Sequence, residues 1–236
     1  MSYLSQLSDN VSNLTFNRKK EYIRHNFERY IDHRLKHKNC AVLEIGPGLG
    51  EFVSYCNDRG VTNIDVVDRE GDVIDYVDTK FKVNNRYVSQ DVCPIDRKLN
   101  LYDIMVMTQV LEHIPKEKHI SYLQTLYAHL RRNGVILITV PNIGNPLAIY
   151  ERYYDYTHET AFTDHSLLQL ADFAHLENST VFVRGFHIPP YDAVNIIRSA
   201  FQYTLHGLFK LLFMINGGVY PRILTTNITL IIEKGE

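Results

Sequence analysis

Carboxylate and imidazole side chains stand together in one aromatic segment of the chain. The segment YDYTHETAFT, residues 154–163, contains Asp155, His158 and Glu159, and another histidine, His113, lies in the segment VLEHIP. Such groups can take a proton from a hydroxyl nucleophile, or they can hydrogen-bond the backbone of a polar loop. The sequence therefore provides three catalytic candidates, His113, Asp155 and His158, with a purely structural role as the alternative.

The candidate metal ligands do not form a recognisable pattern. The zinc-binding pattern H-E-x-x-H is absent, because Ala161 and Phe162 stand where it would be completed. The three cysteines, Cys40, Cys56 and Cys93, are widely spaced and show no CxxC pair. Cys40 and Cys93 adjoin apolar runs and are predicted to be buried, reduced thiols. The sequence predicts neither a metal site nor a disulfide framework.

A glycine-rich turn indicates a binding site for a second group. Residues 44–50 read EIGPGLG and end the apolar segment CAVLEIG, which is typical of a buried strand. Glycines allow positive φ angles and let a ligand approach the backbone. The dinucleotide fingerprint would need a glycine at position 51, which is Glu51. Acids beside a helix N-terminus repel a pyrophosphate and suit a cationic ligand.

Acidic residues follow the next two expected strands. Asp68 ends the segment NIDVVD, where a carboxylate can accept both hydroxyls of a ribose. Asp91 follows a short third strand and is placed to accept a hydrogen bond from the exocyclic amine of an adenine. Gln109 follows a fourth strand, in the crevice where α/β sheets bind ligands. Each acid alone could be a helix cap or a turn residue, but the ordered set favours a ligand site.

The elements that must position these residues follow from the apolar periodicity. Helices and strands alternate, and the strands are apolar on both faces, which predicts a parallel sheet covered by helices on both sides. A polar, aromatic loop is expected at 142–163, and a mostly apolar helical stretch at 191–215. Helices are expected at 20–36, 51–59, 73–77, 115–132 and 166–174, and strands at 40–46, 63–68, 86–89, 103–108, 135–140, 179–186 and 223–234.

These motifs resemble those of the class I S-adenosylmethionine-dependent methyltransferases. The matching segments are VLEIGPGLG, the strand end at Asp68, QDV at 90–92 and DIMVMTQVLEHIP, which occur in order between 41 and 141. The resemblance implies an α/β, Rossmann-like fold with a mostly parallel seven-stranded sheet in the order 3-2-1-4-5-7-6, helices on both faces and an antiparallel last strand. It also implies a methyltransferase activity.

The same resemblance implies the cofactor, S-adenosylmethionine, with S-adenosylhomocysteine as product. Glu44, Gly46 and Gly48 would surround the methionine part of the cofactor. Asp68 would hold the ribose, and Asp91 the adenine amine, while the backbone of Gln109 would face the methionine side. The full predicted cofactor-binding set is Glu44, Gly46, Gly48, Gly50, Asp68, Arg69, Asp91, Val92 and Gln109.

A narrower resemblance concerns the methyl acceptor. DYTHETAFT followed by HSLLQLADFA looks like a D-x-T-H-E-x-x-F-T pattern of methyltransferases associated with bacterial surface polysaccharide biosynthesis, and the LTTNITLIIEK ending is similar. The chain departs from that pattern at 173–175, where a Gly-Phe pair often ends the helix. The resemblance implies O-methylation of a sugar, or of a sugar-linked phosphate or phosphoramidate group, in a capsule or lipopolysaccharide precursor. The alternatives are a quinone-type or other aromatic acceptor, and a non-catalytic cofactor-binding protein.

Composition argues against a nucleic-acid partner and for one domain. The 236 residues carry a formal net charge of −2. The segment TQVL stands where base N-methyltransferases usually carry a D/N/S-P-P-aromatic motif. The acceptor is therefore expected to be a small molecule or a glycan precursor. We expect a single domain over 1–236, with an N-terminal helical extension (1–39), a core (40–186), a helical insertion (187–222) and a last strand (223–236).

The apolar stretch at 191–215 leaves several roles open. It could cover the acceptor site, form a homodimer interface, or contact a membrane surface through 205–215. The stretch has few basic residues to attract anionic lipid, so a packed helix in a lid or dimer is favoured. The opening segment MSYLSQLSDN lacks the basic and apolar parts of a secretory signal, and no apolar run approaches bilayer length. The sequence predicts a cytoplasmic protein.

Overall fold

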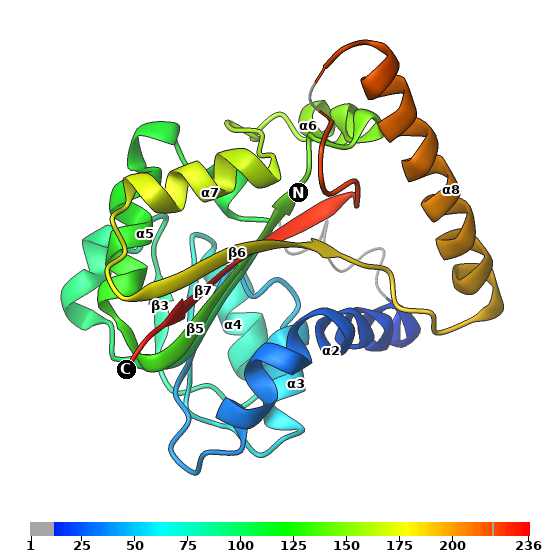
Figure 1. Ribbon diagram of the computed structural model, residues 1–236. Coiled ribbons are helices and arrows are strands. Elements are labelled where there is room, and N and C mark those ends of the chain that lie inside the picture. Colours follow the sequence, from blue (N-terminus) through cyan, green and yellow to red (C-terminus); the bar gives the residue numbers. More distant parts are fainter. Residues whose placement is uncertain (1–11, 219) are drawn as a thin grey trace.

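Buried strands alternate with helices along most of the chain. The computed structural model describes residues 12–218 and 220–236 (Figure 1). The first eleven residues of the predicted N-terminal extension lie outside the described residues. The strands are β1 (Val42–Ile45), β2 (Ile64–Asp68), β3 (Arg86–Val88), β4 (Tyr102–Thr108), β5 (Leu130–Pro141), β6 (Ser179–Phe186) and β7 (Asn227–Lys234).

These strands form one seven-stranded sheet in the order β3-β2-β1-β4-β5-β7-β6. The first five strands pair in parallel, and β7 is antiparallel to both β5 and β6. The predicted Rossmann-like fold, the strand order and the antiparallel last strand are confirmed. Parallel pairing brings the carboxyl ends of β1, β2 and β4 to one edge of the sheet, where ligands bind in such folds.

Helices cover both faces of the sheet. The α-helices are α2 (Asn13–Leu35), α3 (Glu51–Asn57), α4 (Gly71–Lys80), α5 (His119–Ala128), α6 (Ile149–Tyr154), α7 (Asp164–Phe173) and α8 (Ala193–Ile215). The short 3₁₀-helices are η1 (Cys93–Lys98), η2 (Leu111–His113), η3 (Lys116–Lys118) and η4 (Pro146–Ala148).

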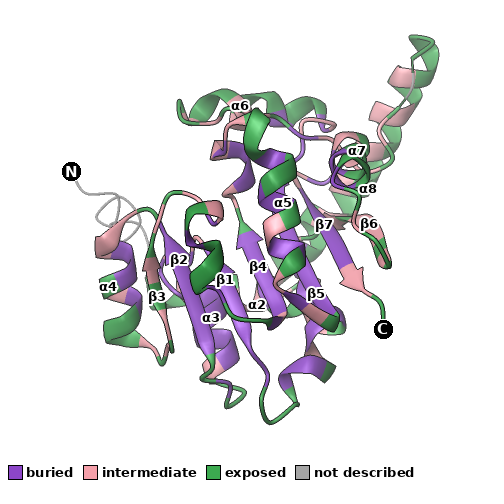
Figure 2. Cartoon of the chain, turned by 90° about the vertical axis from the view of Figure 1, so that its left-hand side faces the viewer, coloured by how far each residue is buried: buried purple, intermediate pink, exposed green. Residues whose placement is uncertain are grey.

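Two hydrophobic clusters hold these layers together. Side chains of α2, α3 and α4 pack on one face of the sheet, and those of η1, α5 and α7 pack on the other. Neighbouring residues of one strand enter opposite clusters, as Val42 and Leu43 do. Both residues are fully buried, which explains why the central strands are apolar throughout. Figure 2 shows the buried central strands enclosed by partly exposed helices.

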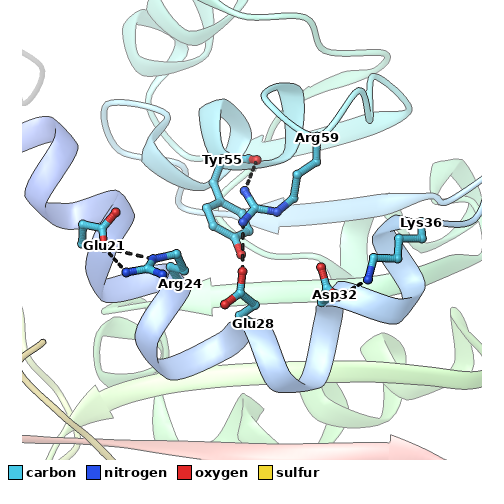
Figure 3. Close-up of polar contacts among 7 residues, drawn as sticks. All are labelled: Glu21, Arg24, Glu28, Asp32, Lys36, Tyr55 and Arg59. Atoms are coloured by element: carbon cyan, nitrogen blue, oxygen red, sulfur yellow. Dashed lines mark hydrogen bonds and ion pairs between the residues drawn. The ribbon is translucent and has the colours of Figure 1, made fainter.

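Helix α2 begins at Asn13, earlier than the expected start at residue 20. The side chain of Ser12 accepts a hydrogen bond from the backbone N–H of Thr15 and so caps the helix. On its polar side α2 is tied to the end of α3, because the Arg59 guanidinium donates to Glu28 Oε1 at 3.1 Å (Figure 3). An exposed pair of this kind contributes at most about 1 kcal/mol, so the buried side of α2 is what fixes the helix on the sheet.

The structure corrects several expected elements. The helix expected over 115–132 ends at Ala128, and β5 begins at Leu130. The apparent helix stop at 133–134 is instead an irregularity in β5, where Asn133 has a φ of 60° and the pairing with β4 shifts register. The loop expected at 142–163 contains η4 and α6. Cys40 is buried as predicted, whereas Cys93 is only half-buried.

Helix α8 lies between β6 and β7 in the sequence and stands at one side of the molecule (Figure 1). Large apolar side chains of the predicted 191–215 stretch do not pack on the core of this chain, since Ile197 is 57% exposed and Phe201 is 72% exposed. In contrast, Asn195 is buried near the start of the helix. Within the described ranges, no helix combines the length and the apolar content needed to cross a bilayer. The expected domain boundaries stay a prediction.

Candidate functional site

A pocket of ≈ 580 Å³ opens at the carboxyl ends of the parallel strands. The turn after β1 and the ends of β2 and β4 bound it, and apolar side chains of α2 form part of its wall. The stacked rings of Tyr22 and Phe186, with centroids 5.9 Å apart, belong to this wall and were not expected from the sequence. The predicted site residues that line the pocket are Glu44, Gly46, Gly48, Asp68, Arg69, Asp91, Gln109, His113 and Asp155.

The glycine turn forms a close-fitting cradle. Gly46 has a φ of +70°, and a Cβ atom added there would lie 2.4 Å from Cγ2 of Val110. A larger residue at that position would be strained by the positive φ and would have to displace the side chain of Val110. Gly48 has a φ of +54° and also lines the pocket. Gly50 plays a different part, because it caps α3 and lies against the ring of Phe81.

Glu44 is a buried carboxylate on the pocket wall. It is 6% exposed, and its Oε2 atom has no hydrogen-bond partner within the described part of the chain. Burial, followed by the negative charge of Glu51, raises the pKa of Glu44 well above its ordinary value. A buried carboxylate without a full set of partners is costly, and a cationic ligand in the pocket would offset that cost. This position therefore fits a positively charged group.

Two further acids border the pocket. Asp68 is 9% exposed, and its Oδ1 atom accepts a hydrogen bond from the backbone N–H of Glu70 at 2.9 Å. Burial raises the pKa of Asp68. Asp91 Oδ1 accepts from the backbone N–H of Cys93 at 2.9 Å, and Lys118 Nζ lies 3.4 Å from Asp91 Oδ2. The lysine partner of Asp91 was not expected from the sequence.

The remaining predicted cofactor residues differ in placement. Val92 is fully buried and packs in the core that contains α5. Arg69 lines the pocket, with its Nε atom 3.3 Å from Glu70 Oε1. Gln109 has a φ of 56°, which is unusual for a residue with a side chain. Its Nε2 atom donates to Asn227 Oδ1 at 3.0 Å, so Gln109 joins the end of β4 to the start of β7.

A hydrogen-bond chain brings the catalytic candidates together. Thr157 Oγ1 lies 2.9 Å from His113 Nδ1 and donates to Asp155 Oδ1 at 2.7 Å. The hydroxyl donates to Asp155, so it accepts from His113, and this leaves the other ring nitrogen, Nε2, without a proton in the neutral ring. The ring of His158 lies beside that of His113, with centroids 4.7 Å apart. Thr157 was missed, although its D-x-T spacing is typical of a turn in which the carboxylate binds the threonine.

The ionisation of these groups follows from their surroundings. Burial, followed by the neighbouring His158, lowers the pKa of His113, so the neutral ring dominates near pH 7. Burial alone would raise the pKa of Asp155, but the hydrogen bonds from Thr157 together with the neighbouring His113 and His158 hold the pKa below its ordinary value. The hydrogen bonds among Asp155, Thr157 and His113 therefore join a charged carboxylate, a hydroxyl and a neutral imidazole.

Glu112 is a second residue of this region, besides Thr157, that sequence reasoning missed. It is 1% exposed, and burial raises its pKa to about 8. Its backbone carbonyl accepts hydrogen bonds from the N–H groups of Glu159 at 2.8 Å and Thr160 at 3.2 Å. These bonds attach the 154–163 segment to the turn after β4. Glu159 itself is exposed.

The chain matches one family of known sequences and many solved structures. The model of a family described as "Methyltransferase domain" matches residues 15–181. No curated protein matches the chain significantly.

Three of the similar structures illustrate the likeness. A SAM dependent methyltransferase from Archaeoglobus fulgidus is 20% identical, with a TM-score of 0.63, over 95% of this chain and 100% of that chain. The plantazolicin methyltransferase BpumL, in complex with a pentazolic desmethylPZN analog and SAH, is 16% identical, with a TM-score of 0.64. That match covers 99% of this chain and 90% of BpumL. An S-adenosylmethionine dependent methyltransferase from Mesorhizobium loti is 11% identical, with a TM-score of 0.56, over 88% and 97%. At these identities the likeness concerns the fold.

Proposed function

The chain belongs to the methyltransferase-domain family, and from that premise we propose that it transfers a methyl group from S-adenosylmethionine to an oxygen of a sugar or of a sugar-linked phosphate or phosphoramidate group. The family match covers residues 15–181 of the 236. S-Adenosylmethionine is the methyl donor of this family. The finer proposal, the glycan acceptor, is supported by the D-x-T-H-E-x-x-F-T segment at the pocket.

The pocket residues fit this cofactor. The partly unpartnered Glu44 carboxylate suits the cationic methionine end, and the Gly46–Gly48 turn leaves room for close approach to the backbone. Asp68 would hold the ribose, and Asp91 the adenine amine, in competition with Lys118. When bound, the cofactor supplies an electrophilic methyl carbon on a sulfonium sulfur.

The acceptor would bind beside His113. Methyl transfer requires the acceptor oxygen to be held in line with the methyl group, and a hydroxyl acceptor must also lose a proton. The Asp155–Thr157–His113 chain orients the imidazole on the pocket wall, with Nε2 available to accept a hydrogen bond from that hydroxyl. These hydrogen bonds are the observation that carries the proposal, because an oriented imidazole on the pocket wall supports activation of an acceptor hydroxyl, either directly or through a bound group. A phosphate acceptor would not need it.

A screen for methyl uptake tests the acceptor class. Purified protein with isotopically labelled S-adenosylmethionine would be offered nucleotide sugars and sugar phosphates, with catechols and hydroquinones in parallel. We expect label in a sugar-linked product. Transfer to the phenols alone would replace the glycan proposal with the aromatic one. Cofactor binding by calorimetry without transfer to a broad acceptor set would favour a non-catalytic role.

One observation favours the aromatic acceptor as the second candidate. Helix α6, next to the Asp155 turn, carries exposed tyrosines, and the rings of Tyr150 and Tyr154 lie 5.5 Å apart. Exposed aromatic rings can stack on a planar substrate, although they also pack on sugar faces. The phenol arm of the screen separates the two.

The remaining partner and location predictions stay proposals. The net charge of −2 supports a small-molecule acceptor rather than a nucleic acid. The exposed apolar face of α8 is compatible with the homodimer and the membrane-surface contact that the sequence left open. Sedimentation of the purified protein and flotation with lipid vesicles would distinguish them. The cytoplasmic location rests on the sequence alone.

A further inference from the structure

We propose that Glu112, His113 and His158 form a binding site for one divalent transition-metal ion on the acceptor side of the pocket. Each residue offers one ligand atom, and these atoms all lie within 4.8 Å of one another. No metal site was predicted from the sequence, because the patterns tested there combine His158 only with residues close to it in the sequence. Folding instead joins His158 to two residues of η2.

The carboxylate of Glu112 is the strongest reason for this assignment. Glu112 is 1% exposed, and neither carboxylate oxygen has a hydrogen-bond partner among the residues described. A buried carboxyl group normally has hydrogen-bond partners or a cation, because a buried polar group without a partner costs free energy in either protonation state. A bound cation between Glu112 and the two rings would remove that cost.

The backbone holds His158 in place independently of its ring. The N–H groups of Glu159 and Thr160 donate to the carbonyl of Glu112, and Arg152 Nη1 donates to the carbonyl of His158 at 2.7 Å. These bonds fix the segment against η2, so the distance between the two rings does not depend on a ring–ring bond. Such preorganisation is what a ligand set needs in the absence of its ion.

The surroundings of His113 are also those of a metal ligand. Histidine ligands usually bond their second nitrogen to a carboxylate, carbonyl or water, which fixes the ring and raises its basicity. Here Nδ1 of His113 is bonded to Thr157, and Thr157 is bonded to Asp155. Nε2 is therefore the nitrogen left for an ion.

The ligand set indicates the class of ion. Two imidazole nitrogens and one carboxylate oxygen suit Mn²⁺, Fe²⁺, Co²⁺ or Zn²⁺, whereas Mg²⁺ and Ca²⁺ prefer oxygen ligands. Metal–ligand bonds of about 2.1 Å place donors about 3.4 Å apart in a tetrahedral site. Side-chain rotations must bring the three donors to that spacing. Three protein ligands leave a coordination position open for an acceptor oxygen.

The role of the ion follows from its position and rests on the proposed function. His113 lines the pocket in which the acceptor is expected. A hydroxyl that coordinates a divalent ion loses its proton to water far more readily, and the resulting oxyanion is the better nucleophile. In this arrangement His113 acts through the ion and is not itself the proton acceptor. Transfer then forms the oxygen–methyl bond, breaks the sulfur–methyl bond and releases S-adenosylhomocysteine.

Metal binding can be measured without any acceptor. The full chain, freed of affinity tags and treated with a chelator, would be titrated with Co²⁺ while its visible absorption is recorded, and with Zn²⁺ and Mn²⁺ by calorimetry. We expect one ion per chain. Glu112→Gln, His113→Gln and His158→Gln should each weaken binding by about 100-fold or more, because each removes a direct ligand.

Matched controls identify the site. Glu117→Gln and His165→Gln change the same residue types at exposed positions and should bind Co²⁺ as the unaltered protein does. No binding of Co²⁺, Zn²⁺ or Mn²⁺ would overturn the proposal. Binding by the three ligand variants with the affinity of the unaltered protein would overturn it as well. Binding of Mg²⁺ alone would overturn the assigned ion class.

A second titration separates this proposal from the proposed function. Each metal-free preparation would also be titrated with S-adenosylhomocysteine. Retained cofactor binding with no metal binding would remove the ion and leave the methyltransferase proposal standing. Metal binding without cofactor binding would do the reverse. The ligand variants should keep cofactor binding, which also shows that they are folded.

Discussion

His113 Nδ1 and Thr157 Oγ1 lie 2.9 Å apart, although their residues are 44 positions apart in the sequence. Thr157 Oγ1 also donates to Asp155 Oδ1, so this hydroxyl determines which nitrogen of the neutral His113 ring carries the proton. The contact is equally useful whether His113 takes a proton or holds an ion, because both need Nε2 without a proton.

Replacing that hydroxyl should impair turnover and little else. Thr157→Val keeps the shape of the side chain and removes both hydrogen bonds, so we expect turnover to fall by about 10- to 100-fold. Thr157→Ser keeps the hydroxyl and should retain most of the activity. Calorimetry with S-adenosylhomocysteine should give the same affinity for all three proteins. Equal turnover of Thr157→Val and the unaltered enzyme would rule out an orienting role.

The steric requirement at Gly46 can be separated from its backbone requirement. Gly46 and Gly60 both have positive φ angles, but only at Gly46 would a Cβ atom meet a neighbour, Val110 at 2.4 Å. Gly60→Ala should cost about 1–2 kcal/mol of unfolding free energy from the backbone alone. Gly46→Ala should cost about 1–3 kcal/mol more and should lose cofactor binding. Urea unfolding measures the free energy of unfolding, and calorimetry measures cofactor affinity. Similar results for the two variants would contradict the close fit around Gly46.

Asp68 tests the ribose contact without removing the turn. Asp68→Asn keeps an oxygen that can accept from the backbone N–H of Glu70, so the local structure should remain. It replaces a charged acceptor of two hydroxyls with a weaker one, and we expect S-adenosylhomocysteine to bind about 10-fold less tightly or worse. Adenosine binding should weaken in parallel, whereas methionine binding should not. Unchanged affinity for S-adenosylhomocysteine would remove Asp68 from the cofactor site.

The sheet and the cofactor side could be predicted because their signals are local. A buried parallel strand is apolar along its whole length, and the glycine turn and the acid at Asp68 directly follow such strands. Prediction failed where the same local sequence is compatible with a helix end and with an irregularity inside a strand. Arg131 and Arg132 followed by Asn133 and a glycine resemble a helix end, but they lie in β5 between Leu130 and Val135, the residues that pair with β4.

The acceptor side could be predicted only in part because it depends on packing between distant segments. His113, Asp155 and His158 were chosen for their residue types, and nothing in their spacing brings the histidines together. Their contact arises because the carbonyl of Glu112 binds the 154–163 segment. Glu112 is important because its carboxyl oxygens are buried without hydrogen-bond partners among the described residues. The residue type alone does not reveal this.

Glu44 should reduce the stability of the empty protein in a pH-dependent way. Burial raises its pKa in the folded state above that of the unfolded chain. Its contribution to stability is therefore fully present below the unfolded pKa and is lost as the pH rises above about 4.5. Glu44→Gln removes the ionisation, so its Tm should exceed that of the unaltered protein at pH 7 to 8, with the difference shrinking toward pH 4.5.

The same change should weaken cofactor binding, because a neutral amide cannot pair with a cationic ligand. The exposed Glu117→Gln serves as the matched control and should leave both the Tm profile and the affinity for S-adenosylmethionine unchanged. A gain in Tm together with a loss of affinity would mean that the carboxylate is retained for the ligand at the expense of stability. A Tm difference that does not vary with pH would show that Glu44 does not titrate on unfolding, and would contradict this account.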